Sequence, residues 1–218
     1  MRLSSQEISR KLLHLFALLM PIGIFYGPLL HLSGAMVTII LAILFFGSMI
    51  LEFFRLRVPA VQKLFFAMFG SMLRKEESFK VTGSTWIIGA ALLCSLLFSK
   101  TPYVSFIVLT LFVLGDAAAA LVGISVGRIK IGKKSLEGSL ACFATCIIIS
   151  LAVFPFIPGV LDVWGGKMPV LIAAVTAFVI TVFELVPLYV APKLIINDNL
   201  AVPVIAGYVI LLLNKFIR

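Results

Sequence analysis

Residues 114–139 carry the densest group of side chains capable of chemistry in an otherwise apolar chain. The segment reads LGDAAAALVGISVGRIKIGKKSLEGS, in which Asp116 ends an apolar run and three spaced glycines follow. Glycine lets backbone approach a ligand closely, and clustered cations bind polyanions through charge-assisted hydrogen bonds. The cations are Arg128, Lys130, Lys133 and Lys134. The spacing therefore predicts a phosphate site, in an enzyme that acts on a phosphorylated ligand beside lipid.

The composition predicts that this site belongs to an integral membrane protein. The 218 residues are 62% hydrophobic and 12% charged, with a mean hydropathy of +1.20, which excludes an ordinary soluble fold. Apolar runs long enough to cross a hydrocarbon core of about 30 Å occur at 12–30, 34–54, 82–99, 102–123, 139–157, 168–188 and 199–214. We therefore expect a single all-α domain, residues 1–218, with about seven transmembrane helices.

The distribution of basic residues predicts how these helices are oriented. With a cytoplasmic N-terminus, all of the 18 lysines and arginines lie in cytoplasmic loops except Lys100, Lys167, Lys215 and Arg218. This asymmetry follows the positive-inside rule and predicts an N-in, C-out topology. The net charge of +9 therefore reports topology, and we expect no nucleic-acid partner. Short loops and the lack of a targeting segment favour a prokaryotic plasma membrane, with the oligomeric state left open.

The long second cytoplasmic loop contains a further helical pattern. Apolar residues recur at helical spacing in VPAVQKLFFAMFGSML, residues 58–73, which is too short to span. Lys63 and Arg74 flank its apolar side, as in a helix that lies in the membrane interface. We expect an interfacial amphipathic helix, and a helix that packs on the protein is the alternative.

Polar residues within or beside the apolar runs converge on the cytoplasmic layer. Counted at about 1.5 Å per residue from the outer helix ends, Asp116 and Glu184 both reach the inner leaflet. Glu52 ends the second run, while Asp198 and Asn199 open the seventh. Acids in such places are costly and tend to be functional or paired. A salt bridge that merely closes the bundle is the structural alternative for Asp116.

The N-terminal segment adds a charged helical face to the same layer. It comprises Glu7, Arg10, Lys11 and His14, whose spacings of three, four and seven place them on one side of a helix. A charged anchor explains this face almost as well as a functional role. The basic run at 128–134 is likewise explicable as a topology signal, but that explanation does not require the interleaved glycines, Ser135 and Glu137.

Two short motifs in the central segment have other interpretations. Residues 127–134, GRIKIGKK, approach the P-loop pattern, but Lys134 stands where Ser or Thr must reach the metal and no βαβ unit surrounds it. Gly123 and Gly127 match the small-xxx-small pattern of helix packing, which is common in membrane proteins. The first motif is therefore rejected, and the second remains a packing alternative.

The chain resembles the CTP-dependent lipid kinases, which include dolichol kinase, phytol kinase and the fungal-type diacylglycerol kinase. The signature of that family is similar to GDAAAALVGISVGRIKIGKKSLEGS, residues 115–139. Matching parts elsewhere are EISRKLLH at 7–14, EFFR at 52–55, Gly83-Ser84-Thr85, and Glu184 followed by DNLAVP from Asp198. The resemblance runs from about residue 7 to residue 207 and is closest to phytol kinase-like prokaryotic members.

The resemblance implies transfer of the γ-phosphoryl group of CTP to the hydroxyl of a membrane lipid alcohol, with Mg²⁺ as the divalent cation. Such transfer requires cations and backbone donors around the phosphates, and a carboxylate-held metal. We expect the nucleotide phosphates to be bound among Gly123, Gly127, Arg128, Lys130, Lys133, Lys134, Ser135, Glu137, Gly138 and Ser139. We expect Asp116, with Asp198 or Glu184, to hold the metal, because Mg²⁺ needs only one or two carboxylates beside phosphate oxygens and water.

The remaining roles stay open at this stage. One remaining acid, or His14, is expected to take the hydroxyl proton, and the residues do not decide which. Supporting roles are expected for Glu7, Arg10, Lys11, Glu52, Arg55 and Asn199. The alternatives are a cytidylyltransferase that makes a CDP-lipid, and an anion or lipid-phosphate transporter without nucleotide turnover. The preference for CTP over ATP rests on the resemblance, and the identity of the alcohol (phytol, another polyprenol or diacylglycerol) is not readable.

Overall fold

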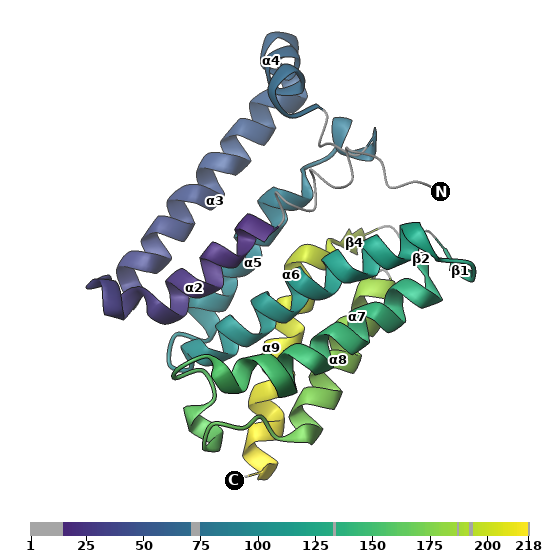
Figure 1. The fold of residues 1–218 in the computed structure, drawn as a ribbon. Coiled ribbons are helices and arrows are strands. Elements are labelled where there is room, and N and C mark those ends of the chain that lie inside the picture. The colour runs from purple at the N-terminus through teal and green to yellow at the C-terminus, as the bar shows by residue number, and fades with distance from the viewer. Residues whose placement is uncertain (1–14, 71–74, 133, 187, 192–193, 218) are drawn as a thin grey trace.

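The computed structural model describes residues 15–70, 75–132, 134–186, 188–191 and 194–217, and within them the chain is helical apart from two short hairpins (Figure 1). The α-helices are α2 (Leu19–Tyr26), α3 (Gly34–Arg57), α4 (Pro59–Phe69), α5 (Gly83–Leu97), α6 (Pro102–Ser125), α7 (Leu136–Ile148), α8 (Val170–Leu185) and α9 (Asp198–Ile217). The hairpins are β1 (Lys130–Ile131) with β2 (Lys134–Ser135), and β3 (Leu188–Ala191) with β4 (Leu194–Ile196), both antiparallel. The all-α expectation is confirmed, and the hairpins are an addition that the apolar pattern did not predict.

Short irregular helices extend or connect several of these elements. They are η1 (Phe16–Leu18), η2 (Gly27–Leu30), η4 (Lys75–Ser78), the π-helix η5 (Ile149–Val153), η6 (Phe154–Phe156) and η7 (Asp162–Trp164). Because η5 and η6 follow α7 without a break, one apolar helical segment runs from Leu136 to Phe156.

Each apolar run of the sequence corresponds to a helical segment, but the segments differ in length. Four are long and apolar enough to cross a membrane: Gly34–Arg57, Pro102–Ser125, Leu136–Phe156 and Asp198–Ile217. The other three, Phe16–Leu30, Gly83–Leu97 and Val170–Leu185, are shorter apolar helices. The chain is therefore a polytopic helical membrane protein with four candidate spans among the described residues, and the count of seven remains a prediction.

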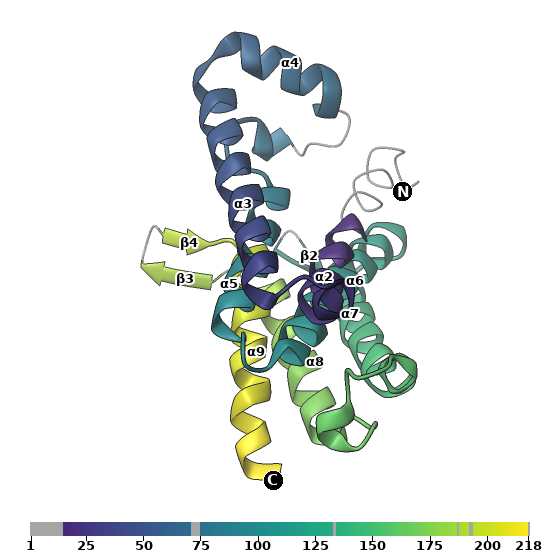
Figure 2. The same cartoon turned by 90° about the vertical axis from the view of Figure 1, so that its left-hand side faces the viewer.

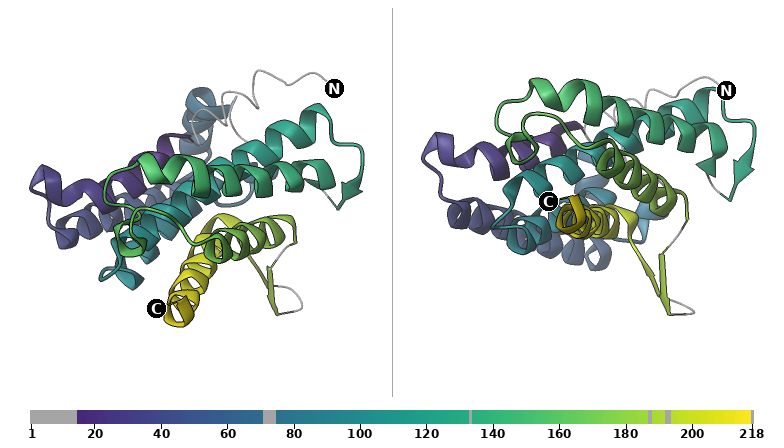
Figure 3. Two further views of the ribbon diagram at one scale, coloured as in Figure 1. Left: turned by 60° about the horizontal axis from the view of Figure 1, so that its bottom comes forward. Right: turned by 90° about the horizontal axis from the view of Figure 1, so that it is seen from below.

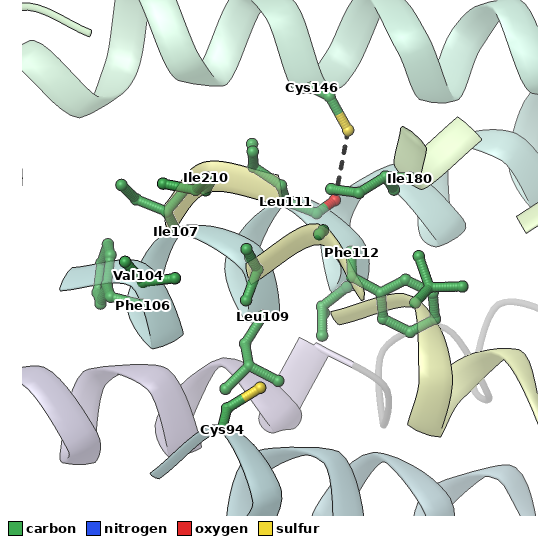
Figure 4. Packing of buried hydrophobic residues seen from close by; sticks show 14 of the residues in the cluster. Cys94, Val104, Phe106, Ile107, Leu109, Leu111, Phe112, Cys146, Ile180 and Ile210 are labelled. Carbon is green, nitrogen blue, oxygen red and sulfur yellow. Dashed lines mark hydrogen bonds between the residues drawn. The ribbon is translucent and has the colours of Figure 1, made fainter. Parts of the chain in front are cut away.

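Helix α6 forms the centre of the bundle. It packs against α2, α5, α7, α8 and α9, and its residues from Val104 to Val113 are buried in succession. A helix that is apolar on all sides is stable only when neighbours or lipid surround it. Figure 4 shows its aliphatic and aromatic side chains packed against Ile180 and Ile210, with the Cys146 thiol directed at the carbonyl of Leu111, 3.6 Å away. Helix α6 therefore forms the centre of a hydrophobic core to which the neighbouring helices also contribute.

Helix α3 lies at the edge of the bundle, where it packs mainly on α5 and leads into α4 (Figures 1 and 2). Only 11% of its most apolar window is buried, so most of its isoleucines, leucines and phenylalanines face outward, as expected for a lipid-facing span. The predicted helix after the second run is confirmed as α4, which begins at Pro59 and has no buried residue. Its location in the membrane interface remains a prediction.

Several helix ends gather at one end of the bundle. Helices α8 and α9 lie side by side in both views of Figure 3, and the β3–β4 hairpin that joins them projects from the bundle in Figure 2. Hairpin β1–β2 joins α6 to α7 at the same end (Figure 1). The end of α8, the start of α9 and β2 are thereby brought together, and their polar residues form the candidate site.

Candidate functional site

Hairpin β1–β2 carries Lys134 back across the bundle end. Lys130 pairs with Ser135 and Ile131 with Lys134, so the strands turn within a few residues. Gly132, at the turn, has a φ of +60°, in the left-handed region that glycine occupies without a steric penalty. Strand β2 runs directly into α7. The position of Lys134 is therefore fixed from one side by a tight turn and from the other by a helix.

Lys134 joins the last turn of α8 to the first residue of α9. Its Nζ lies 2.7 Å from Glu184 Oε1 and 3.2 Å from Asp198 Oδ2. The same ammonium donates a hydrogen bond to the backbone carbonyl of Glu184. One lysine thus satisfies a C-terminal carbonyl of α8 and pairs with two carboxylates, so the structure brings these three candidate residues together.

Asp116 of α6 belongs to the same electrostatic group. It is half-buried, and its charge acts on both Lys134 and Glu184. Burial lowers the pKa of the Lys134 ammonium, but the carboxylates of Glu184, Asp198 and Asp116 outweigh burial and raise that pKa above its ordinary value. Lys134 therefore remains charged at neutral pH. We call Asp116, Lys134, Glu184 and Asp198 the carboxylate–lysine cluster.

The cluster has a water-exposed end and a dry end. The side chains of Asp198 and Lys134 are 39% and 33% exposed, whereas that of Glu184 is 4% exposed. Glu184 Oε1 meets Lys134, but the second oxygen, Oε2, is buried without a hydrogen-bond partner. Buried polar atoms in native proteins are nearly always paired with protein, water or ligand. The lone Oε2 therefore marks the dry end as an acceptor position.

Ser135 and Glu137 build the local structure of the segment after the glycines. Ser135 caps α7, since its Oγ accepts the amide hydrogen bond of Gly138 at 3.2 Å. The Glu137 carboxylate accepts hydrogen bonds from the amides of Arg128 and Ile129, at 2.9 and 3.1 Å. Ser139 is buried and donates to the Ser135 carbonyl. These contacts hold the hairpin against the start of α7.

Gly123 and Gly138 allow α6 and α7 to approach closely. A Cβ on Gly138 would lie 2.6 Å from the Ala119 carbonyl oxygen, and one on Gly123 would lie 3.0 Å from Ser135 Oγ. Gly127 lies beyond the end of α6, where a Cβ would lie 2.3 Å from the Gly123 carbonyl oxygen. The space made by the missing side chains is therefore occupied by protein, and Gly123 and Gly127 do not share a helix face. Phosphate binding by these residues remains a prediction.

The other predicted phosphate ligands have different positions. Arg128, two residues before β1, and Lys130 of β1 are both exposed, and neither takes part in the described ion pairs of Lys134 with Glu184 and Asp198. Lys133 lies outside the described residues, as does the N-terminal set Glu7, Arg10, Lys11 and His14. The described part of the site thus brings together Lys134 and three carboxylates, with further cations at its water-exposed margin.

A second polar group, at the start of α5, surrounds the predicted supporting residues Glu52 and Arg55. Arg55 is fully buried, and its guanidinium donates to Glu52 Oε2 from two nitrogens, with Nε at 2.8 Å. It also donates to the carbonyls of Glu77 and Lys80, at 2.9 and 2.7 Å. Thr82 donates to Glu52 Oε1 through its amide and its hydroxyl. This Glu52–Arg55 pair fixes the segment that enters α5.

Asn199 links this pair to the carboxylate–lysine cluster. Its Nδ2 donates to the Gly83 carbonyl at 3.0 Å, and it directly follows Asp198 in the chain. Two residues of this region were not predicted from the sequence: Glu77, whose Oε1 accepts the Gly83 amide hydrogen bond at 2.9 Å, and Thr82, which donates to Glu52. Both are near the Gly83-Ser84-Thr85 motif. The sequence around a polar loop residue does not indicate which helix end its side chain will contact.

The residues present suit a magnesium ion that also binds phosphate. Within the described ranges, no three His, Cys, Asp or Glu side chains are arranged to hold a metal ion by themselves. Mg²⁺ commonly takes one or two carboxylates together with phosphate oxygens and waters. Asp198, at the water-exposed end of the cluster, and the half-buried Asp116 supply hard oxygen donors, so their chemistry fits such an ion.

Comparison with known proteins leaves the family of this chain open. The chain is 26% identical over 201 residues to an uncharacterized protein of Rickettsia prowazekii, an alignment that covers 90% of this chain and 89% of the relative. No family model matches the chain, and no solved structure matches it. The high coverage of both chains indicates that a protein of similar length also occurs in Rickettsia prowazekii.

Proposed function

We propose that this protein is a CTP-dependent lipid kinase, which transfers the γ-phosphoryl group of CTP to the hydroxyl of a membrane lipid alcohol. The observation that carries the proposal is the carboxylate–lysine cluster at one end of a membrane bundle, where Lys134 contacts Glu184 and Asp198. Charged groups of both signs, held at one end of apolar helices, suit a phosphorylated ligand that comes from water. The resemblance of residues 115–139 to the lipid kinase signature adds the reaction type.

The cations of the hairpin are suited to hold the nucleotide. The Lys134 side chain is one-third exposed, so a phosphate oxygen can approach its ammonium from water, and Arg128 and Lys130 lie exposed on the same hairpin. Asp198 and Asp116 would hold the magnesium ion, which when bound neutralises charge on the phosphate oxygens. Phosphoryl transfer depends mainly on such positioning and charge stabilisation. The described residues supply both.

The location at a membrane end suits the two substrates. CTP is soluble, whereas the hydroxyl of a lipid alcohol lies near the headgroups, so the two can meet only at the interface. We propose seven spans with a cytoplasmic N-terminus in a plasma membrane, which puts the cluster on the cytoplasmic side where nucleotide is available. The α4 helix would then lie in the interface beside the lipid entrance.

The test is nucleotide turnover by purified protein in lipid vesicles with Mg²⁺. CTP or ATP is offered with phytol, a longer polyprenol or diacylglycerol, and the lipid and nucleotide products are identified. Asp116→Asn, Asp198→Asn and Lys134→Met are assayed beside two controls, Asp162→Asn and Lys100→Met. Neither control residue belongs to the cluster, and both lie in the loops that join the opposite helix ends.

If the protein is the proposed kinase, the wild type and both controls should produce CDP and a phosphorylated lipid. In the three cluster variants we expect turnover to fall by about 100-fold or more, because each variant removes charge stabilisation at the phosphates. Pyrophosphate and a CDP-lipid in place of these products would establish the cytidylyltransferase. If no lipid alcohol supports turnover of either nucleotide, the kinase proposal is wrong and binding or transport remains.

A further inference from the structure

The buried carboxylate of Glu184 has one partnered and one unpartnered oxygen. Oε1 lies 2.7 Å from Lys134 Nζ, whereas Oε2 is shielded from solvent and accepts no hydrogen bond from the described residues. An ionised carboxylate oxygen in a dry environment is unfavourable unless a donor meets it. Two buried hydroxyls of the same helix, Thr176 Oγ1 and Thr181 Oγ1, also lack a partner, and neither donates a hydrogen bond to Oε2. Oε2 is therefore an acceptor without a donor among the described contacts.

The surroundings of Glu184 indicate what kind of molecule brings that donor. On the same side of α8, one, two and three turns before Glu184, lie Ile180, Ala177 and Ala173, all fully buried, so the carboxylate ends an apolar helix face. On its other side, Lys134 and Asp198 lead to water. A polyphosphate entering from water meets Asp198 and Lys134 first.

We infer that Glu184 Oε2 binds the hydroxyl of the lipid alcohol and accepts its proton, while the nucleotide occupies the side of Lys134 and Asp198. The inference rests on the proposed function and assigns the base that the sequence left open among the acids and His14. A lipid alcohol combines an apolar chain with a single O–H donor at its end. That combination matches a lone acceptor oxygen at the end of an apolar helix face.

Phosphoryl transfer to the alcohol forms one bond to phosphorus and breaks another. The alcohol oxygen forms a bond to the γ-phosphorus of CTP, and its hydrogen passes to Glu184 Oε2. The bond between the γ-phosphorus and the bridging oxygen breaks, and its electron pair leaves on the β-phosphate of CDP. Lys134 contacts Glu184 and Asp198 at once, so its ammonium lies between the two substrates and can stabilise charge on the transferred group. Solvent then accepts the proton from Glu184, which restores the carboxylate.

The charged groups that face Glu184 come from three elements. They are Lys134 of β2, whose Nζ lies 2.7 Å from Glu184 Oε1, Asp116 of α6 and Asp198 of α9. On α7, Glu137 bonds the Arg128 and Ile129 amides. Lys134 keeps its charge across neutral pH, so it does not titrate together with the carboxylates in that range. An acidic loss of turnover that depends on residue 184 therefore reports the Glu184 carboxyl.

The experiment compares Glu184→Gln and Glu184→Asp with the wild type and with Asp162→Asn. Glutamine keeps the shape and an acceptor oxygen but cannot take a proton, and aspartate keeps the carboxylate on a shorter arm. Three quantities are measured in vesicles: the pH profile of kcat, the affinity for CTP with Mg²⁺, and the equilibrium binding of phytol against its methyl ether without nucleotide. The ether keeps the chain and lacks the O–H donor.

We expect Glu184→Gln to bind CTP with unchanged affinity, to lose about 100-fold or more in kcat, and to lose the acidic limb of the profile. We expect Glu184→Asp to keep the acidic limb of the profile at a reduced kcat. The wild type should bind phytol more tightly than its methyl ether, and both variants should reduce this difference in affinity. Asp162→Asn should match the wild type throughout.

Three results would overturn the inference. Turnover by Glu184→Gln at the wild-type rate, with an intact acidic limb in its pH profile, would exclude Glu184 as the proton acceptor. A parallel loss of CTP affinity would make Glu184 part of the nucleotide site instead. If Glu184→Gln does not fold, Glu184→Asp decides, and wild-type behaviour of that variant would exclude the role. A wild type that turns over no nucleotide refutes the proposed function itself, which is a separate outcome.

Discussion

Asn199 Nδ2 donates a hydrogen bond to the backbone carbonyl of Gly83 across 3.0 Å, and so joins the first turn of α9 to the first residue of α5. The contact depends on glycine, because a Cβ at position 83 would lie 2.6 Å from that nitrogen. Asp198, the neighbour of Asn199, binds Lys134 at 3.2 Å. The amide of Asn199 therefore ties the helix start that carries Asp198 to a segment held by the Glu52–Arg55 pair.

Loss of this contact should reduce catalysis by displacing Asp198. We expect Gly83→Ala and Asn199→Ala each to lower kcat/KM for CTP and to lower stability by about 1 kcal/mol, the typical net value of one hydrogen bond. Turnover kinetics and thermal unfolding in detergent measure both. The matched control is Gly34→Ala, at the first residue of α3, where a Cβ meets nothing within 4 Å. An equal loss of activity in that control would contradict the explanation.

Breaking the Glu52–Arg55 pair should destabilise the protein strongly. Arg55→Met leaves the buried Glu52 carboxylate without its cation, and removing one member of a buried pair typically costs about 3–5 kcal/mol. Arg57→Met is the control, because Arg57 is exposed and lies over the Phe53 ring. We expect a clear decrease in Tm for Arg55→Met and little change for Arg57→Met. Similar Tm values for the two variants would contradict the buried pair.

The contact of α6 with α7 should not tolerate a methyl group at Gly138. A Cβ there meets the Ala119 carbonyl at 2.6 Å, so Gly138→Ala must separate the helices and should cost about 1–3 kcal/mol, as overpacking does. Gly47→Ala in α3 meets nothing within 4 Å and should raise stability by up to about 1 kcal/mol, through helix propensity. Thermal unfolding of the two variants, which should shift in opposite directions, checks this prediction.

The charge of Lys134 should stabilise the fold across the neutral range. Its pKa is raised above 10.5 by the carboxylates of the cluster, so its contribution is fully present below the pKa of the unfolded chain. That contribution is lost as the pH rises through the raised pKa. We expect the difference in Tm between the wild type and Lys134→Met to stay constant from about pH 7 to about pH 9 and to narrow at higher pH. A difference that already narrows at neutral pH would contradict the raised pKa.

Much of the fold could be predicted from the sequence because the signal is local. Each predicted apolar run is a helix in the structure, and the helix predicted after the second run is α4. Run length alone does not give helix length, since α5 and α8 end earlier than their apolar runs whereas α3, α6 and α9 extend beyond theirs. The β1–β2 and β3–β4 hairpins left no periodic signal, because strands of two to four residues are too short to show one.

The candidate site was predicted in part, because the depth of each acid in the membrane could be estimated along its own helix. Counting residues put Asp116, Glu184 and Asp198 in one layer, and the structure shows that the last two meet Lys134, a contact that the count did not predict. Depth does not reveal which helices are neighbours. The contacts of Glu137 with the Arg128 and Ile129 amides, and of Asn199 with Gly83, depend on that arrangement.

The sequence by itself determined that this is a helical membrane protein with its acids and cations concentrated in one layer, because hydrophobicity and span length are properties of consecutive residues. Only the tertiary structure decided which charges meet. Lys134 lies 50 and 64 residues from its partners in the chain, and packing of α8 beside α9 brings those partners together. The tertiary structure also decided which atoms occupy the space beside Gly138, where the Ala119 carbonyl oxygen would lie 2.6 Å from a Cβ.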